Sequence, residues 1–442
     1  MNTLFPEFSI RRLGEPRIKS PIQLSENSEE GFADFVDDQQ RVVFGIEVSA
    51  PQASDSLGSR GLLEKAGPRK AIYFDPSKVH AGIVTCGGLC PGLNNVIRST
   101  VMTLWHRYGV RRISGIRYGF RGLLPEARLT VKELTPDLVS DIHQFGGTTL
   151  GSSRGWGEQT EALVDAMEQL HLSMLFTIGG DGTQRGALRL ADEIARRGNR
   201  MAVVGIPKTI DNDLSFVERS FGFETAVSRA VESVNCAHVE ARGAIDGIGI
   251  VKVMGRESGF IAAHTALATN AVNFVLIPEV SFDLDGPAGL FAAIERRLDA
   301  RHHAVLLVAE GAGQRLVETS GKDASGNKKL GDIGVYLKER ISQYFSDKAR
   351  ETTLKYIDPS YLIRAAPANP TDAIYCARLG ANAVHAAMSG RTACLVGMVN
   401  HRLVHVPIAL ASAHRNRVHP GSPLWRDVLE TTGQPNMVNR HE

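Results

Sequence analysis

The sequence predicts an α/β fold built on mainly parallel sheets, and two observations support this prediction. After residue 80, short runs rich in Val, Ile and Leu alternate with Gly-rich or polar loops and helix-like stretches. The runs are almost continuously apolar, which is typical of strands buried on both faces. We therefore expect strands at 81–85, 173–178, 201–206, 248–254, 273–278 and 304–310.

Residues 1–79 precede this pattern and show neither strand nor helix periodicity. They contain several prolines and the acidic stretch ENSEEGFADFVDD. Two interpretations of this N-terminal extension remain open: a loosely ordered arm, or a segment that packs on a neighbouring subunit.

Helix-like stretches complete the α/β pattern. Residues 183–198 place their apolar side chains on one helical face, with the arginines mostly opposite. A second such stretch covers 370–390 and precedes the apolar runs TACLVGMV and RLVHVPI. We expect these two late runs to return to the first sheet as strands.

The composition is that of an ordinary globular protein. The chain has 442 residues, and 50 Lys plus Arg against 48 Asp plus Glu give a net charge of +2. This length predicts two or three domains, and the balanced charge argues against nucleic acid or a membrane surface as partner. No apolar run approaches the roughly 18 residues of a membrane span, and no signal-peptide pattern is present, so we expect a cytoplasmic protein.

Four loops follow predicted strands at their carboxyl ends, where open α/β sheets bind ligands. In the first, TCGGLCPGLNN, glycines such as Gly88 let backbone N–H groups approach an anion, although a simple tight turn explains them too. In the second, GGDGT, Asp181 lies in a glycine cradle that suits a nucleotide phosphate with Mg²⁺. The alternative is that Asp181 caps a helix.

The third and fourth loops carry charged groups suited to phosphoryl transfer. Transfer to a hydroxyl needs a base near the attacking oxygen and cations on the moving group, and in PKTIDND Asp211 and Lys208 match these needs. Asp213 is equally explained as structural. In VMGRESG, Arg256 follows a strand on a glycine turn, where it is able to bind a phosphate.

Taken in order, TCGGLCPGLN, GGTTLGSSRG, IGGDGT, PKTIDND, VMGR, AEGAGQ and YLIRAAPANPTDA resemble the 6-phosphofructokinases. The resemblance runs from about residue 80 to 410. It implies two Rossmann-like three-layer lobes with mainly parallel sheets plus the extension 1–79. The ATP-binding lobe would comprise 80–222 with 363–410, and the fructose 6-phosphate-binding lobe 223–362 with 411–442.

The resemblance also implies a role for each matching residue. Asp211 would be the base that deprotonates the sugar 1-hydroxyl, Lys208 and Arg154 would stabilise the moving charge, and Asp181 would bind Mg²⁺. The phosphoryl donor would be held by Gly88, Arg154, Gly155, Gly180, Asp181, Gly182 and Thr183. Fructose 6-phosphate would be held by Thr209, Ile210, Asp211, Met254, Gly255, Arg256, Glu310, Tyr361, Leu362, Ile363 and Arg364.

Two positions in these motifs indicate which phosphoryl donor the protein uses. Pyrophosphate-dependent members of the family carry a second aspartate after GGD, where this chain has Gly182, which favours ATP. Those members share Lys208, but glycine and lysine together resemble the ATP-dependent trypanosomatid and plant enzymes. We therefore expect ATP, with pyrophosphate as the alternative. A catalytically inactive, sugar-phosphate-binding regulatory subunit is disfavoured because Asp181, Asp211 and Arg256 are all present.

Two departures from the familiar bacterial enzymes limit the transfer of roles. An arginine that reaches the neighbouring subunit's substrate phosphate is replaced by Gly247, and a sugar-binding histidine is replaced by Tyr361. The family usually forms tetramers or dimers, so we expect a homotetramer, with a dimer as the alternative.

Overall fold

The computed structural model describes residues 7–25, 33–46, 61–317, 321 and 329–439. The chain forms two compact units, each assembled from several segments. The first unit comprises 1–209, 214–222 and 366–415, and the second comprises 210–213, 223–365 and 416–442. Within the described ranges, no helix has the length and apolarity needed to cross a bilayer.

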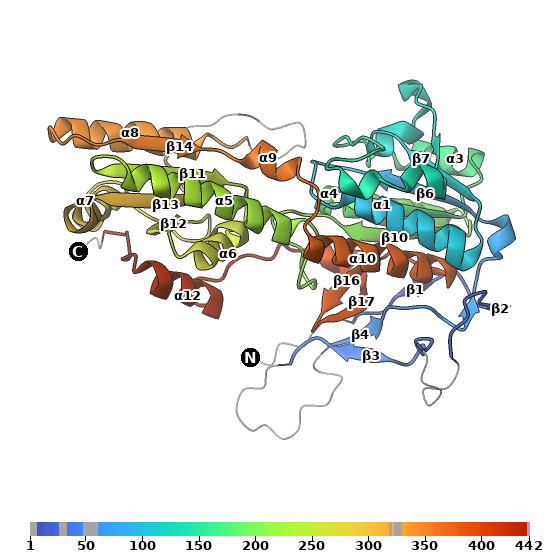
Figure 1. Cartoon of the computed structure of the whole chain (residues 1–442). Coiled ribbons are helices and arrows are strands. Elements are labelled where there is room, and N and C mark those ends of the chain that lie inside the picture. The colour runs from blue at the N-terminus through green and yellow to red at the C-terminus, as the bar shows by residue number, and fades with distance from the viewer. Residues whose placement is uncertain (1–6, 26–32, 47–60, 318–320, 322–328, 440–442) are drawn as a thin grey trace, which may run out of the picture. The chain divides into compact units, whose positions relative to one another are not determined.

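A nine-stranded sheet forms the centre of the first unit (Figure 1). Its five inner strands, β16-β10-β9-β6-β7, are parallel, and antiparallel strands flank them on both sides. In sheet order the strands are β3 (Arg41–Val43), β4 (Leu62–Lys65), β17 (Arg402–Pro407), β16 (Cys394–Val399), β10 (Ala202–Pro207), β9 (Met174–Gly179), β6 (His80–Thr85), β7 (Arg112–Ile116) and β8 (Lys132–Glu133).

The strands predicted for this unit are confirmed to within one residue in β6, β9 and β10. The two late runs form β16 and β17 and return to this sheet, as expected. Strand β7 was not predicted, because Ser114 and Gly115 interrupt its apolar run. A Cβ at Gly115 would lie 2.4 Å from Leu150 Cδ2, so a larger residue there would require the Leu150 side chain to shift.

Helices cover the large sheet. Helices α1 and α10 pack against each other and lie in front of the sheet in Figure 1. Helices α3 and α4 pack together, and their apolar side chains join those of the strands in one buried cluster. The helices of this unit are α1 (Leu93–Met102), α2 (Pro136–Val139), α3 (Thr160–Gln169), α4 (Asp181–Arg196), α10 (Pro370–Met388) and α11 (Ile408–Ala411).

The N-terminal extension is built into the first unit. Strands β3 and β4 continue the large sheet beyond β17, while β1 (Arg11–Arg12) pairs with β15 (Arg391–Thr392) and β2 (Ile18–Lys19) pairs with β5 (Ala71–Ile72). Neither interpretation of residues 1–79 anticipated these strands. They are only two to four residues long, too short to show a period in the sequence.

A buried ion cluster ties the extension to the late strands. Arg391, fully buried, contacts Glu64 and also donates to Asp38 Oδ1 at 2.7 Å. Burial alone would raise the pKa of Glu64, but the hydrogen bonds and charges of His405 and Arg391 hold that pKa well below its usual range. The extension is therefore anchored by paired charges as well as by strand pairing.

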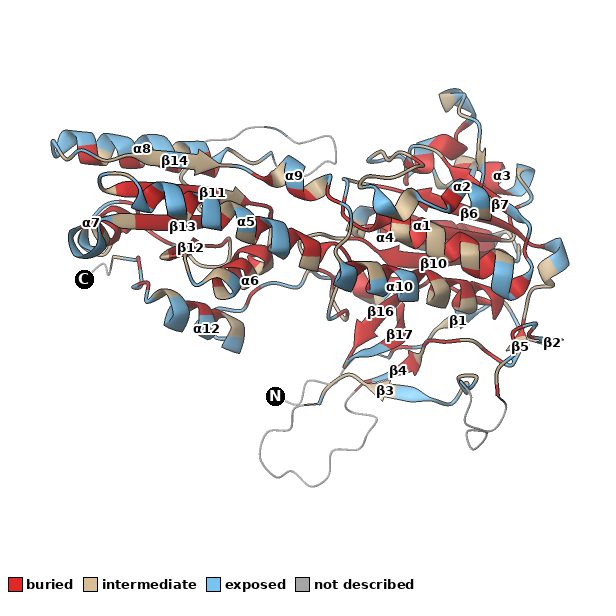
Figure 2. Ribbon diagram, in the orientation of Figure 1, coloured by how far each residue is buried: buried red, intermediate tan, exposed pale blue. Residues whose placement is uncertain are grey.

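The second unit has a parallel four-stranded sheet between two layers of helices. Alternate side chains of its central strand separate cleanly: Val305 and Leu307 join one apolar cluster, and Leu306 and Val308 join another. Figure 2 shows this sheet as largely buried. The strands in sheet order are β12 (Phe274–Leu276), β13 (His303–Ala309), β11 (Gly247–Val253) and β14 (Leu354–Ile357). The helices are α5 (Phe223–Arg242), α6 (Phe260–Thr269), α7 (Leu290–Arg301), α8 (Ile333–Asp347), α9 (Ser360–Arg364) and α12 (Pro423–Thr432).

Candidate active site

In the first unit, three predicted loops meet at the carboxyl ends of the adjacent parallel strands β6, β9 and β10. Lys208, just after β10, donates from its side-chain nitrogen to the carbonyl oxygen of Gly88 at 2.6 Å. Its backbone N–H donates to the carbonyl oxygen of Gly179 at 3.0 Å. One buried lysine thus joins the loops TCGGLCPG, GGDGT and PKTIDND.

The glycines of these loops leave room for close backbone approach. Gly87 has φ +88°, and a Cβ there would lie 3.1 Å from Lys208 Nζ. A Cβ on Gly180 would lie 3.1 Å from the carbonyl oxygen of Lys208. In contrast, a Cβ on Gly182 would meet no atom within 4 Å, so the position opens into free space.

A fourth segment, GGTTLGSSRG, lies beside the first loop. The Ser152 hydroxyl donates to the Gly87 carbonyl at 2.6 Å, and the Gly87 N–H donates to the Ser153 carbonyl at 2.9 Å. These bonds place Arg154 and Gly155 next to the glycine-rich loop, and both residues are exposed. Their exposure leaves them accessible to a ligand bound at this sheet edge.

Asp181 begins helix α4, where the helix dipole favours a negative charge. Its side chain is only 11% exposed, and its Oδ2 accepts a hydrogen bond from Nε of Arg415 at 2.8 Å. Thr183 is buried, with its side chain directed at Gly179. The side chain of Thr183 therefore points into the interior of the unit. Its backbone is the part of the residue that could contact a phosphate.

The surroundings of Asp181 fit a single magnesium ligand. Mg²⁺ in nucleotide sites is commonly held by one or two carboxylates plus water and phosphate oxygens, so a protein cage is not required. None is present: the described residues contain no group of three or more His, Cys, Asp or Glu able to hold a metal. The guanidinium of Arg415 shows that the Asp181 carboxylate stabilises a cation at this position.

In the second unit, Asp211 is partly buried beside the loop that follows β11. The backbone N–H of Arg256 hydrogen-bonds the Asp211 carboxyl group, and the Ser258 hydroxyl donates to the Asp211 carbonyl at 3.2 Å. The buried Oδ1 of Asp211 has no hydrogen-bond partner among the described residues. This oxygen is thus available to accept a proton from a bound group.

The surroundings of Asp211 tune its protonation. Burial raises the pKa of Asp211 to about 7, and the negative charges of Asp213 and Glu310 add to this rise. The positive charge of Arg364 and the hydrogen bond from Arg256 act in the opposite direction. A carboxyl group with a pKa near the working pH is suited to general base catalysis.

Two glycines allow the loops after β11 and β13 to approach each other. Gly255 has φ +129°, and a Cβ there would lie 2.5 Å from the Ser258 carbonyl oxygen. The N–H of Gly311 donates to the Gly255 carbonyl at 3.0 Å. Arg256 and Glu310, one from each loop, are thereby held near Asp211, where both contribute to its pKa.

The YLIR segment forms helix α9, and its four residues differ in exposure. Tyr361 and Leu362 are 85% and 75% exposed, whereas the Ile363 side chain is fully buried in the apolar core with Met254. Arg364 lies near enough to Asp211 to lower its pKa. Met254 and Ile363 are buried as whole residues and act as packing groups of this core.

The departure at Gly247 has a steric reason. Gly247 opens β11, and a Cβ at this position would lie 2.0 Å from the carbonyl oxygen of Ala241. An arginine therefore does not fit here. This chain cannot present at Gly247 the phosphate-binding arginine of the familiar bacterial enzymes.

Arg415, which contacts Asp181, is a residue of this region that sequence reasoning did not single out. It lies 234 positions from Asp181 in the chain, within the polar run SAHRNR. No spacing rule links the two positions. The cluster of arginines near the end of the chain was the only available signal.

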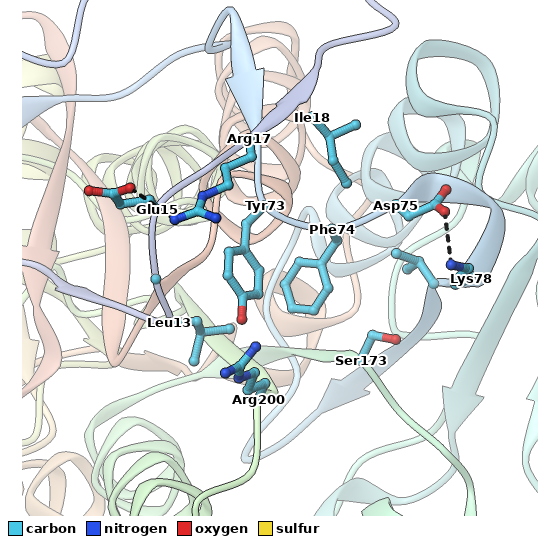
Figure 3. A pocket seen from close by; sticks show the side chains of 12 residues that line it. Leu13, Glu15, Arg17, Ile18, Tyr73, Phe74, Asp75, Lys78, Ser173 and Arg200 are labelled. Atoms are coloured by element: carbon cyan, nitrogen blue, oxygen red, sulfur yellow. Dashed lines mark hydrogen bonds and ion pairs between the residues drawn. The ribbon is translucent and has the colours of Figure 1, made fainter.

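A pocket of about 620 Å³ lies elsewhere in the first unit (Figure 3). Val79 and Ser173, which line the pocket, immediately precede β6 and β9. Arg200, a third lining residue, lies two residues before β10. The pocket thus lies at the amino ends of the strands, whereas the glycine-rich loops lie at their carboxyl ends. Two of its cations are paired with acidic neighbours, Arg17 with Glu15 and Lys78 with Asp75.

Comparisons with known proteins agree with the loop motifs. A family model described as Phosphofructokinase matches residues 80–387. An ATP-dependent 6-phosphofructokinase of Borreliella burgdorferi is 52% identical over 440 residues, covering 97% of each chain. An ATP-dependent 6-phosphofructokinase of Trypanosoma cruzi is 49% identical over 377 residues, covering 84% of this chain and 76% of that protein.

The fold also matches solved structures. A pyrophosphate-dependent phosphofructokinase from Nitrosospira multiformis aligns with a TM-score of 0.67 at 19% sequence identity. The alignment covers 83% of this chain and 94% of that one. At this identity the likeness establishes the fold and carries no information on the donor.

Proposed function

The chain belongs to the phosphofructokinase family, and on this basis we propose that it transfers the γ-phosphoryl group of ATP to the 1-hydroxyl of fructose 6-phosphate. The products are fructose 1,6-bisphosphate and ADP. The observation that carries the proposal is Asp211, a partly buried carboxyl group with a pKa raised to about 7 and a buried oxygen without a hydrogen-bond partner among the described residues, inside the motif where the family resemblance places its base.

The second unit binds the sugar phosphate in this proposal. Asp211 Oδ1 accepts the proton of the 1-hydroxyl as its oxygen attacks the phosphorus. Arg256 and Arg364 bind the anionic 6-phosphate, with Glu310 as a hydrogen-bond acceptor for a sugar hydroxyl. Thr209, Ile210, Gly255, Tyr361 and Leu362 complete the set, and Met254 and Ile363 pack in the buried core of the same unit.

The first unit binds ATP. The backbone around Gly88, Gly155, Gly180, Gly182 and Thr183 receives the phosphates at the carboxyl ends of three strands. Lys208 and Arg154 offset the negative charge that develops on the moving phosphoryl group. Asp181 would hold Mg²⁺, which would further neutralise that charge.

The donor is ATP rather than pyrophosphate. Gly182 leaves open space where the pyrophosphate-dependent members carry an aspartate, and the similar proteins from B. burgdorferi and T. cruzi are named ATP-dependent. The homotetrameric assembly implied by the family resemblance and the cytoplasmic location expected from the sequence are part of the proposal. Light scattering tests the first and cell fractionation tests the second.

A coupled assay tests the function directly. Purified protein receives fructose 6-phosphate and Mg²⁺, with ATP in one cell and pyrophosphate in the other. We expect turnover with ATP alone. Turnover with pyrophosphate alone would be consistent with Asp211 as the base and would show that ATP is not the donor. No turnover in either cell, with and without AMP, would show that the protein does not catalyse the proposed reaction.

A further inference from the structure

Arg415 reaches Asp181 from a distant part of the first unit. Its Nε donates to Asp181 Oδ2 at 2.8 Å, with the two side chains 30% and 11% exposed. A buried carboxylate is costly without a compensating charge, and the guanidinium supplies that charge. The family resemblance assigned no role to Arg415.

The backbone of Arg415 is held from two sides. Arg415 forms an antiparallel bridge with Leu214, one residue after PKTIDND, and the Ser215 hydroxyl donates to the carbonyl of His414 at 2.9 Å. The preceding helix α11 packs on α4, the helix that Asp181 begins, through Ile408 and Ala411. These contacts hold the backbone of Arg415 at a point from which its side chain reaches Asp181.

A bound metal ion and this guanidinium compete for one carboxylate. Each is a cation, and two cations on the two oxygens of a carboxyl group lie close enough to repel each other strongly where water is largely excluded. An arginine also binds phosphate oxygens well through its planar fork. A donor that arrives with Mg²⁺ provides a phosphate for Arg415 to bind and a metal ion for Asp181 to bind.

We propose that Arg415 is a positioning residue that occupies the Asp181 carboxylate until the phosphoryl donor arrives. Arg415 then exchanges Asp181 for a donor phosphate, and Asp181 takes the metal ion. The exchange makes the metal affinity of Asp181 conditional on the donor, so free divalent cations do not occupy the site. This inference rests on the proposed function, because it assumes that Asp181 holds the donor's metal.

Binding of Mn²⁺ alone, followed by electron paramagnetic resonance without nucleotide, tests the exchange. We expect the wild-type protein and Asp181→Asn to bind Mn²⁺ equally weakly. Arg415→Gln removes the competing charge and should bind Mn²⁺ at least tenfold more tightly, while Arg415→Lys keeps the charge and should stay at the wild-type level. The matched control is Arg196→Gln, which removes an arginine paired with Glu193 at the other end of α4.

Three results would overturn the inference. The first is Arg415→Gln binding Mn²⁺ no better than wild type. The second is a gain that persists in the double variant Asp181→Asn/Arg415→Gln, which would place the metal elsewhere. The third is that wild-type protein binds free Mn²⁺ more than tenfold more tightly than the Asp181→Asn variant does. This comparison does not depend on whether an Arg415 variant folds. Failure of the proposed function has a different signature, the absence of wild-type turnover with ATP.

Discussion

The side-chain nitrogen of Lys208 donates a hydrogen bond to the carbonyl oxygen of Gly88 at 2.6 Å. Lys208 follows strand β10 and Gly88 follows β6, with β9 between these strands in the sheet. The bond spans 120 positions of the sequence and holds the first and third predicted loops at one sheet edge. Lys208 therefore shapes the proposed donor site as well as supplying a charge to it.

Lys208→Met removes this bond and the charge while keeping the length of the side chain. We expect kcat with ATP to fall by about 10²–10³-fold, the scale of losing one preorganised group on the moving charge. The dissociation constant for fructose 6-phosphate, measured by calorimetry, should change less than threefold. Lys348→Met, which removes an exposed lysine paired with Glu295, is the matched control. Wild-type kcat in Lys208→Met would remove Lys208 from the catalytic set.

Asp211→Asn keeps the shape of the proposed base and removes its ability to accept a proton. The expected result is a fall in kcat of about 10²–10⁴-fold, the range for loss of a general base. Fructose 6-phosphate binding, followed by calorimetry, should be retained. A variant that keeps more than a tenth of wild-type kcat would show that another group takes the proton.

The pH profile of kcat should report the raised pKa of Asp211. Because the deprotonated form is the active base, kcat should rise with pH and reach half its plateau near pH 7. Asp213→Asn removes a negative charge that raises this pKa, so its midpoint should lie at lower pH. A midpoint that stays in place, or moves upward, would contradict the assigned coupling.

The same raised pKa predicts a pH-dependent stability difference. The folded protein holds the Asp211 proton more tightly than the unfolded chain, so this contribution to stability is full below the ordinary value of 3.8 and is lost as pH rises through about 7. Above pH 8, Asp211→Asn should be more stable than wild type, by up to about 4 kcal/mol. Urea denaturation at pH 4 and pH 8 measures the difference, and equal stabilities at pH 8 would refute it.

Gly182→Asp places a carboxylate where the proposed ATP phosphates lie. The position has open space, so the folded protein should tolerate the change. We expect kcat/KM for ATP to fall at least about 100-fold, because a negative charge within about 4 Å repels the phosphates. Gly182→Ala, which adds volume without charge, is the control and should stay within a few fold. Unchanged ATP kinetics in Gly182→Asp would contradict the proposal that the ATP phosphates lie next to Gly182.

Arg391→Met tests the anchoring of the N-terminal extension. Arg391 is fully buried and contacts Glu64 and Asp38, so its removal takes away one of the cations that balance the buried Glu64 carboxylate beside Arg12 and Arg69. We expect a loss of about 3–5 kcal/mol in the free energy of unfolding, measured with urea. Arg11→Met, which removes a surface arginine paired with exposed Asp192, should change it by less than about 1 kcal/mol. Equal effects of the two variants would mean that the cluster does not anchor the extension.

Local patterns were sufficient for the inner strands other than β7 and for the loops proposed to carry the chemistry. A strand buried on both faces needs a continuous apolar run, and a loop that lets its backbone approach a phosphate needs glycine. Both requirements act over a few residues. For this reason the sequence alone predicts β6, β9 and β10 and the loops around Asp181 and Lys208. Strand β7 was missed because Ser114 and Gly115 interrupt its apolar run, and the close packing of Gly115 against Leu150 is visible only in the folded chain.

By itself, the sequence determined the α/β class, the order of the motifs and the identity of Asp211 and Asp181 as the groups to examine. Only the tertiary structure decided that residues of the extension add strands to the first unit, that Ile363 faces the core, and that Arg415 pairs with Asp181. The physical reason is that strand pairing, burial and ion pairing join atoms across long stretches of chain. Such contacts leave no local period or spacing, so they become visible only when the chain is folded.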